Sequence, residues 1–163
     1  MRLVVFGNSG AGKSALAKRL AADHGLVHLD LDTLVWEPGM IGVQRPMEAV
    51  RNDLFDFQNR HERWVIEGCY GELVALAAPR STDLVLLDPG EETCIAHCLA
   101  RPWEPHKYAS KVVQDAMLPP LLEWVRGYYT RNDAWSRAGH LRVFDAFEGN
   151  KHLVEDVRDY RAG

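Results

Sequence analysis

The sequence predicts a three-layer α/β fold, in which helices cover both faces of a five-stranded parallel sheet. Five short apolar runs alternate with longer segments of helical periodicity, and this alternation is typical of strands joined by crossover helices. Each run is almost continuously apolar, as expected for a parallel strand whose two faces are both covered. The predicted strands lie at residues 3–6, 26–29, 64–66, 84–87 and 141–144.

The segments between the strands provide the helices. Residues 13–24 and 46–60 are each long enough for a crossover helix, and Gly25 stands where the first helix needs a C-terminal cap. The longest insertion covers residues 102–139. We expect it to hold a proline-rich loop, a helix from about 107 to 117, and a second helix that begins at Pro119-Pro120, because proline is tolerated in a first turn. A stripe at helical spacing predicts core packing there: Leu121, Leu122, Val125, Tyr128 and Trp135.

Size and composition indicate one globular domain that spans residues 1–163. The apolar fraction of 47% and the charged fraction of 26% are average for globular proteins, which argues against disordered and membrane classes. The net charge of −4 argues against nucleic acid as the main partner. No apolar stretch reaches the ~20 residues that cross a bilayer, and the apolar start is too short for a signal peptide. We therefore expect a cytoplasmic protein with reduced thiols, whose oligomeric state the sequence leaves open.

A phosphate-binding motif follows the first predicted strand directly. The pattern G-x-x-x-x-G-K-S is matched by Gly7-Asn8-Ser9-Gly10-Ala11-Gly12-Lys13-Ser14, and chance would produce it at about one position in 30,000. Its glycines let backbone N–H groups surround phosphate oxygens, while the next helix points its positive dipole end at them. We expect Lys13 to contact the β- and γ-phosphates of ATP and Ser14 to bind Mg²⁺. A glycine-rich turn with a solvent-exposed lysine is the alternative.

Three carboxylates are candidates for the metal and the acceptor. In a sheet ordered 2-3-1-4-5 the third strand lies beside the first, so Glu67 at its end is the candidate for holding Mg²⁺ through water; the alternative is a surface glutamate. Asp30 and Asp32 close the second strand on one face. We expect Asp32 nearest the acceptor, where it can take the proton of a hydroxyl, and Asp30 nearer the metal. N-capping of a helix or formation of a turn by Asp32, just before Thr33, is the alternative.

Basic side chains of the insertion are candidates for the cations that stabilise a transferred phosphoryl group. We expect at least one of them to enter the site when the insertion closes as a lid. The candidates are Arg101, Lys107, Arg126, Arg131 and Arg137, with the last three on one helix.

Two other groupings have a structural reading beside a functional one. Cys94, His97 and Cys98 share a helix and would form a zinc-like set with Cys69, but their spacing is unusual for zinc and helix–sheet packing explains small cysteines. Trp36 would either line the acceptor pocket or pack in the core.

The chain resembles the adenylate kinase-like branch of P-loop kinases, which includes nucleoside monophosphate kinases and shikimate kinase. Within that branch it is similar to small proteins labelled DNA topology modulation protein or adenylate kinase. The matching segments are residues 7–14, 28–39, 64–70, 83–88 and 99–101. The resemblance implies a P-loop NTPase fold with a substrate-binding helical region at about 33–60 and a lid at about 101–118. It also implies that Asp30 and Asp32 correspond to the D-x-D of shikimate kinase, and that Arg101 and Arg131 act with the lid.

Three departures from these relatives leave the acceptor open. Glu67 stands where the narrower group has aspartate, residues 68–71 replace the triple glycine of shikimate kinase, and the proline-arginine pair of adenylate kinases is missing after the third strand. Residues and resemblance together predict an ATP- and Mg²⁺-dependent phosphotransferase, which acts on the hydroxyl of a small molecule or on a nucleoside monophosphate. The alternative is a nucleotide-dependent regulatory or nucleic-acid-associated ATPase.

Overall fold

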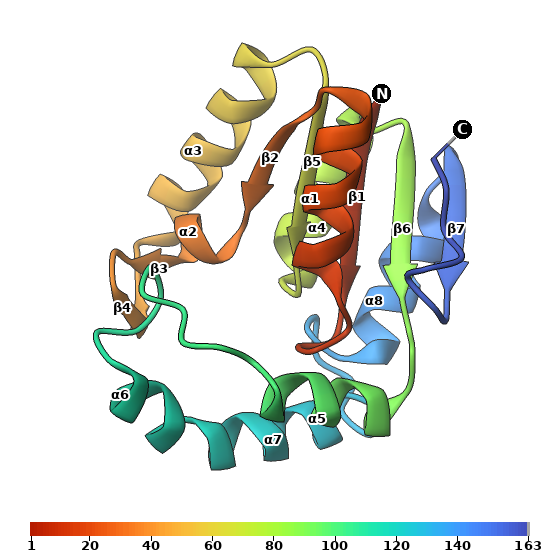
Figure 1. Cartoon of the computed structure of the whole chain (residues 1–163). Helices are drawn as coiled ribbons and strands as arrows, with labels where there is room; N and C mark the ends of the chain where they lie inside the picture. Colours follow the sequence, from red (N-terminus) through yellow and green to blue (C-terminus); the bar gives the residue numbers. More distant parts are fainter. Residues whose placement is uncertain (163) are drawn as a thin grey trace.

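The computed structural model describes residues 1–162 and contains a five-stranded parallel sheet (Figure 1). The strands are β1 (Arg2–Gly7), β2 (Val27–Asp30), β5 (Trp64–Gly68), β6 (Asp83–Leu87) and β7 (Asn150–Val154). They lie in the order β2-β5-β1-β6-β7, and each neighbouring pair is parallel. Counted along the chain among these five strands, this is the order 2-3-1-4-5. The fold class predicted from the sequence is confirmed.

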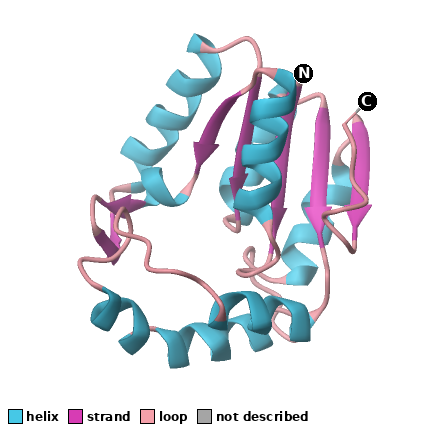
Figure 2. Ribbon diagram, in the orientation of Figure 1, coloured by secondary structure: helices cyan, strands magenta, loops and turns pink. Residues whose placement is uncertain are grey.

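Helices cover both faces of this sheet and complete the three layers (Figure 2). One face packs against α1 (Lys13–His24), while α5 (Glu91–Leu99) and α7 (Leu118–Gly127) join the same core from beyond the C-terminal ends of the strands (Figure 1). The other face packs against α3 (Met47–Arg60), α4 (Gly71–Ala77) and α8 (Arg137–Ala146). In β1, Leu3 and Val5 belong to the first core, while Val4 and Phe6 belong to the second. The strand is continuously apolar because it is covered twice.

The fifth strand was predicted in the wrong place. Residues 141–144 belong to α8, and the strand is β7, six residues further on. The side chain of Ser136 caps α8, because it accepts a hydrogen bond from the backbone N–H of Gly139 at 3.1 Å. Leu141 and Phe144 are three residues apart, so they share one helix face and pack against the sheet. β7 lies at the sheet edge and is mostly exposed, and it therefore lacks the apolar run of a covered strand.

The region 33–60, predicted as helical, contains a β-hairpin. It begins with the short helix α2 (Asp32–Val35), continues as the antiparallel strands β3 (Trp36–Glu37) and β4 (Met40–Gln44), and ends with α3. Gly39 in the turn has a φ of 70°, a left-handed conformation that glycine adopts without strain. The backbone N–H of Ile41 donates to the carbonyl of Lys107 at 3.4 Å. The hairpin thus meets the loop of the insertion, as Figure 1 also shows.

The insertion is less helical than expected. Residues 101–110 form an irregular loop, and α6 spans Lys111–Ala116 because the side chain of Ser110 caps it. The second helix, α7, begins with prolines in its first turn, as expected. Arg126 lies on α7, but Arg131 follows that helix and Arg137 begins α8, so the three arginines do not share one helix. A 3-10 turn, Ala78–Arg80, follows α4. Among the described residues, no helix has the length and hydrophobicity to cross a bilayer.

Gly71, the first residue of α4, lets two backbone segments approach closely. A Cβ atom there would lie 1.8 Å from the carbonyl oxygen of Ala134, so we expect Gly71→Ala to destabilise the fold by about 3 kcal/mol or more. Gly39→Ala is the control, because its Cβ would meet nothing within 4 Å and its cost is the left-handed φ alone, about 1 kcal/mol. Urea unfolding measures both, and an equal loss in the two variants would contradict the close approach.

Candidate active site

The P-loop lies between β1 and α1 at the C-terminal edge of the sheet. Gly10 and Gly12 have φ values of 79° and 93°, a region that other residues enter only with strain. A Cβ on Gly10 would also lie 2.2 Å from the carbonyl oxygen of Cys94 in α5. Only glycine therefore fits at this point, and the loop turns directly into the N-terminus of α1. The sequence motif has the backbone that a phosphate cradle needs.

Polar contacts from α5 and α7 fix the P-loop. The side-chain amide of Asn8, which is 2% exposed, donates to the carbonyl of Val125 at 3.0 Å. His97 Nδ1 donates to the carbonyl of Gly10 at 2.7 Å. Lys13 Nζ donates to the carbonyl of Asn8 at 2.7 Å, so its ammonium lies across the loop. The conformation of the loop is therefore set by its surroundings as well as by its glycines.

Ser14 and Glu67, which were both predicted to hold the metal ion, contact each other. Ser14 Oγ donates to Glu67 Oε1 at 2.7 Å, and the Glu67 side chain is 2% exposed. This contact exists because β5 lies beside β1, where Glu67 is opposite Val5. Burial alone would raise the pKa of Glu67, but His28, Lys13 and Ser14 hold that pKa below its ordinary value. Glu67 is thus a buried, charged carboxylate beside the P-loop.

Asp30 and Asp32 both lie next to this carboxylate. Asp30 ends β2 directly opposite Glu67, and its Oδ1 accepts a hydrogen bond from the backbone N–H of Asp32 at 2.9 Å. Burial and the charges of Glu67 and Asp32 raise the pKa of Asp30 to about 6. Asp30 therefore takes the turn-forming role that was the alternative for Asp32, whose own carboxylate is free for other partners.

Lys107 of the insertion loop binds the aspartate pair. Its Nζ lies 2.7 Å from Asp32 Oδ2, 3.5 Å from Asp30 Oδ2 and 3.5 Å from Glu104 Oε1. The Lys107 side chain is 11% exposed. Burial opposes its charge, but the two aspartates more than offset this and raise the pKa of Lys107. These ion pairs hold the insertion loop against the aspartate pair.

Tyr70 holds the other oxygen of the Asp32 carboxylate. Its hydroxyl donates to Asp32 Oδ1 and accepts a hydrogen bond from Trp36 Nε1 at 2.7 Å. Burial would raise the pKa of Asp32, but the Lys107 ammonium and the Tyr70 hydroxyl outweigh it and keep that pKa below its ordinary value. Asp32 is therefore an ionised carboxylate with a partner on each oxygen.

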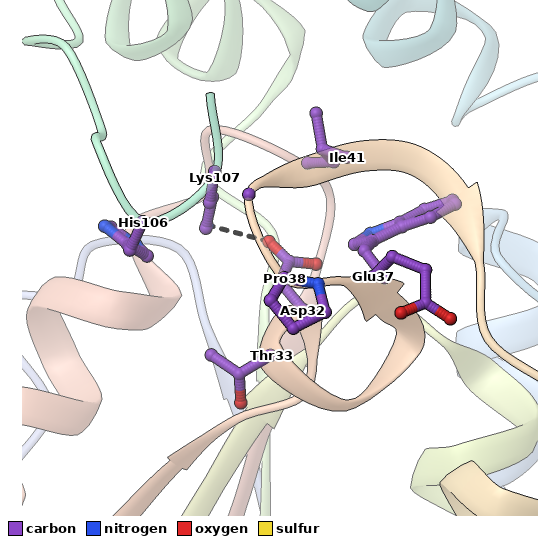
Figure 3. A pocket seen from close by; sticks show the side chains of 9 residues that line it. Asp32, Thr33, Glu37, Pro38, Ile41, His106 and Lys107 are labelled. Carbon is purple, nitrogen blue, oxygen red and sulfur yellow. Dashed lines mark ion pairs between the residues drawn. The ribbon is translucent and has the colours of Figure 1, made fainter. Parts of the chain in front are cut away.

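A cavity of about 300 Å³ opens beside Asp32 (Figure 3). Trp36, Pro38 and Ile41 of the hairpin give it an apolar wall, and Asp32 and Lys107 give it a charged one. Trp36, for which pocket lining and packing were both open, lines this cavity. The volume is at the lower end of the range for ligand pockets, which suits a molecule of metabolite size.

Neither predicted catalytic arginine contacts the aspartate pair in this structure. Arg101 Nη1 lies 3.7 Å from Glu104 Oε2. The Arg131 guanidinium lies 3.5 Å from the ring centre of Trp124 and bonds Asp133 at 2.9 Å. Arg131 still borders the site indirectly, because Trp124 contacts Trp135, which in turn packs edge-on against Tyr70. The catalytic roles of Arg101 and Arg131 stay predictions.

Cys94 and Cys98 are buried in the hydrophobic core that α5 shares with α1 and β1. Within residues 1–162, no three His, Cys, Asp or Glu side chains are arranged to hold a metal ion by themselves.

A buried hydrogen-bond chain that the sequence did not signal supports the loop after β5. The hydroxyl of Tyr128 donates to His140 Nδ1 at 3.0 Å, and His140 Nε2 donates to the carbonyl of Cys69 at 2.8 Å. His140 is fully buried. This chain fixes Cys69, and hence its neighbour Tyr70, from α7 and α8. Sequence reasoning missed Tyr70 and His140 because single aromatic and histidine residues carry no motif.

Solved structures match this chain, whereas no protein-family model and no curated protein does. A sugar kinase from Janibacter sp. HTCC2649 has a TM-score of 0.51 at 16% identity, and the match covers 97% of this chain and 86% of the other. A deoxyadenosine kinase from M. mycoides with bound dATP has a TM-score of 0.51 at 11% identity, with coverages of 97% and 94%. For a shikimate kinase from Aquifex aeolicus vf5, the TM-score is 0.44 at 20% identity, with coverages of 77% and 80%.

These similarities show the fold. The chain has the α/β architecture of P-loop kinases, as the resemblance in its sequence implied. The narrower resemblance to DNA topology modulation proteins stays a prediction. Because these identities are 20% or lower, the activity has to be argued from the site.

We expect the wild-type protein to lose stability more steeply than His140→Gln between pH 6.5 and pH 4. Burial lowers the pKa of His140 from 6.5 to about 4, so in this window the unfolded chain takes up a proton while the folded ring stays neutral. Stability is therefore full above pH 6.5 and falls as the pH drops, by up to about 3 kcal/mol.

Urea unfolding at a series of pH values measures this difference. Asp30, whose pKa is raised, acts in the opposite sense in both proteins and cancels in the comparison. His106→Gln is the control, because the His106 side chain is exposed. Parallel pH profiles for the wild type and His140→Gln would show that the buried ring is not the cause.

Proposed function

We propose that this protein is an ATP- and Mg²⁺-dependent kinase, which transfers the γ-phosphoryl group of ATP to a small molecule in the cavity beside Asp32. One observation carries the proposal: a continuous series of contacts joins the phosphate cradle to that cavity. Ser14 of the P-loop forms a hydrogen bond with Glu67. Glu67 is paired with Asp30 on the neighbouring strand β2. Asp30 in turn accepts a hydrogen bond from the backbone of Asp32, which lines the cavity. A triphosphate on the cradle would end where an acceptor in the cavity begins.

The P-loop fits the phosphates of ATP. Its left-handed glycines and the N-terminus of α1 supply backbone N–H groups. Lys13 already bonds a carbonyl of the loop at 2.7 Å, so its ammonium is near the atoms that would surround the β- and γ-phosphates. Arg101 and Arg131 remain our candidates for cations that approach the transferred group when the insertion closes.

The pair formed by Ser14 and Glu67 fits Mg²⁺. A hydroxyl and a buried carboxylate are oxygen ligands of the kind that this ion prefers, and the charge of Glu67 at 2% exposure calls for a cation nearby. Asp30 would join through water, since its carboxyl lies beside Glu67. When bound, the ion would neutralise charge on the phosphates.

Asp32 is our candidate for the proton acceptor. The hydroxyl of the acceptor would give its proton to the Asp32 carboxylate as its oxygen bonds the γ-phosphorus and the bond from that phosphorus to ADP breaks. Lys107 occupies this carboxylate in the present structure, so the reaction requires Lys107 to move, and its ammonium could then follow the transferred phosphoryl group. The apolar wall around Trp36 favours an acceptor with a carbon skeleton and hydroxyl groups.

We expect Lys13→Ala to reduce acceptor-dependent ADP release by at least about 100-fold, because the cation at the β- and γ-phosphates is lost. A coupled ADP assay would screen nucleosides, nucleoside monophosphates, sugars and hydroxy acids as acceptors. Lys18→Ala is the matched control, because Lys18 is an exposed lysine on the same helix. Slow hydrolysis that no acceptor accelerates would contradict the kinase and favour a regulatory ATPase.

We expect Glu67→Gln to raise the Mg²⁺ concentration that gives half-maximal turnover by about 10- to 100-fold, because changes next to a bound metal commonly weaken metal affinity by that factor. Glutamine keeps the size of the side chain but removes its charge. Titration of turnover with Mg²⁺ at fixed ATP measures this, and calorimetry of ATP without metal should give the same affinity as the wild type. Glu62→Gln is the control, because Glu62 is exposed just before the same strand. Unchanged Mg²⁺ dependence would assign the metal to other ligands.

A further inference from the structure

We propose that Tyr70 is a positioning residue, which reserves Oδ1 of Asp32 and so makes Oδ2 the oxygen that receives the proton of the acceptor. This inference rests on the proposed function. It assigns a role to a residue outside the P-loop and the aspartate pair, and it distinguishes the two oxygens of one carboxylate.

The direction of the Tyr70 hydroxyl is fixed by its partners. Trp36 Nε1–H lies 2.7 Å from the Tyr70 oxygen, and an indole nitrogen can donate but cannot accept. The Tyr70 proton therefore has to point elsewhere, and Asp32 Oδ1 is its acceptor. The result is a one-way relay from Trp36 through Tyr70 to Asp32.

The Tyr70 ring cannot easily turn away from this relay. Tyr70 is 3% exposed and packs edge-on against Trp135, with ring centres 5.0 Å apart, and against Trp36 at 6.3 Å. The backbone just before Tyr70 is fixed by the hydrogen bond from His140 to the carbonyl of Cys69. Burial together with the nearby Cys69 and Asp32 raises the pKa of Tyr70, so the hydroxyl stays a donor over the working pH range.

Lys107, the partner of the other oxygen, comes from a loop of the insertion and not from the core around the sheet. It contacts Asp32 Oδ2 from an irregular loop and through a long aliphatic stem. The following helix α6 contributes no buried residue. When Lys107 leaves, Oδ2 becomes free while Oδ1 keeps its hydrogen bond to Tyr70. The proton of the acceptor hydroxyl then moves to Oδ2, the acceptor oxygen bonds the γ-phosphorus, and ADP leaves with the electrons of the broken bond.

Tyr70→Phe tests the inference, because it removes the hydroxyl and keeps the ring that packs in the core. We expect kcat to fall about 10- to 100-fold, as misorientation of a reacting group commonly causes, with KM for ATP unchanged. Trp36→Phe should produce a smaller fall in kcat, because the Tyr70 hydroxyl then loses the donor that fixes its direction.

Tyr129→Phe is the matched control. Its hydroxyl also donates to an aspartate, Asp88, at 3.1 Å, but it lies outside the relay, so kcat should stay as in the wild type. Thermal unfolding of each variant shows whether the fold is intact. A kcat that is the same in Tyr70→Phe and the wild type would overturn the inference.

A measurement without turnover separates this inference from the kinase proposal. The carboxyl carbon of Asp32 can be observed by ¹³C NMR at one fixed pH in protein labelled at aspartate, with Asp32→Asn for assignment. We expect its chemical shift to change in Tyr70→Phe, because Oδ1 loses its hydrogen bond, and to stay the same in Tyr129→Phe. A protein that phosphorylates no acceptor but shows this change would lose the kinase proposal and keep the positioning role, whereas an unchanged chemical shift would remove the positioning role alone.

Discussion

The crowding of three carboxylates at one edge of the sheet is the constraint on which the site depends. Asp30 and Glu67 are neighbours because β2 lies beside β5, and Asp32 follows within the same turn. Buried like charges of this kind are costly unless cations or protons compensate them. Here Lys13 and Lys107 supply the cations, and the crowding raises the pKa of Asp30 to about 6. The packing of the strands thus concentrates negative charge, and lysines of the P-loop and the insertion neutralise it.

This compensation connects parts of the chain that are far apart in sequence. Lys107 lies in a loop that contacts the hairpin, because its backbone carbonyl accepts a hydrogen bond from Ile41. Its ammonium group compensates the negative charge of the two aspartates at the end of β2. The loop is consequently held over the cavity by electrostatic attraction, since α6 next to it buries no side chain. An arriving ligand that brings its own charges would compete for these partners, which couples occupancy of the site to the arrangement of the insertion.

The parts that the sequence predicted well are those set by local patterns or by a motif. Four of five strands, the helix after the P-loop and the position of Glu67 beside the P-loop follow from apolar runs, a glycine pattern and strand order. The fifth strand was missed because an exposed edge strand has no apolar run, and the hairpin was missed because its turn interrupts a segment expected to be helical. Tyr70 and Lys107 reach Asp32 through tertiary packing, which no spacing rule encodes.

The bond from the Asn8 side chain to the carbonyl of Val125 divides the insertion into two parts of different character. Because α7 is fastened to the P-loop and to the core, it belongs to the permanent framework. The stretch between α5 and α7 has no comparable anchorage in α6. Apart from Lys107, which contacts Asp32 and the hairpin, this stretch can therefore change in sequence during evolution without disturbing the P-loop. The α6 segment is thus free to vary, whereas α7 is not.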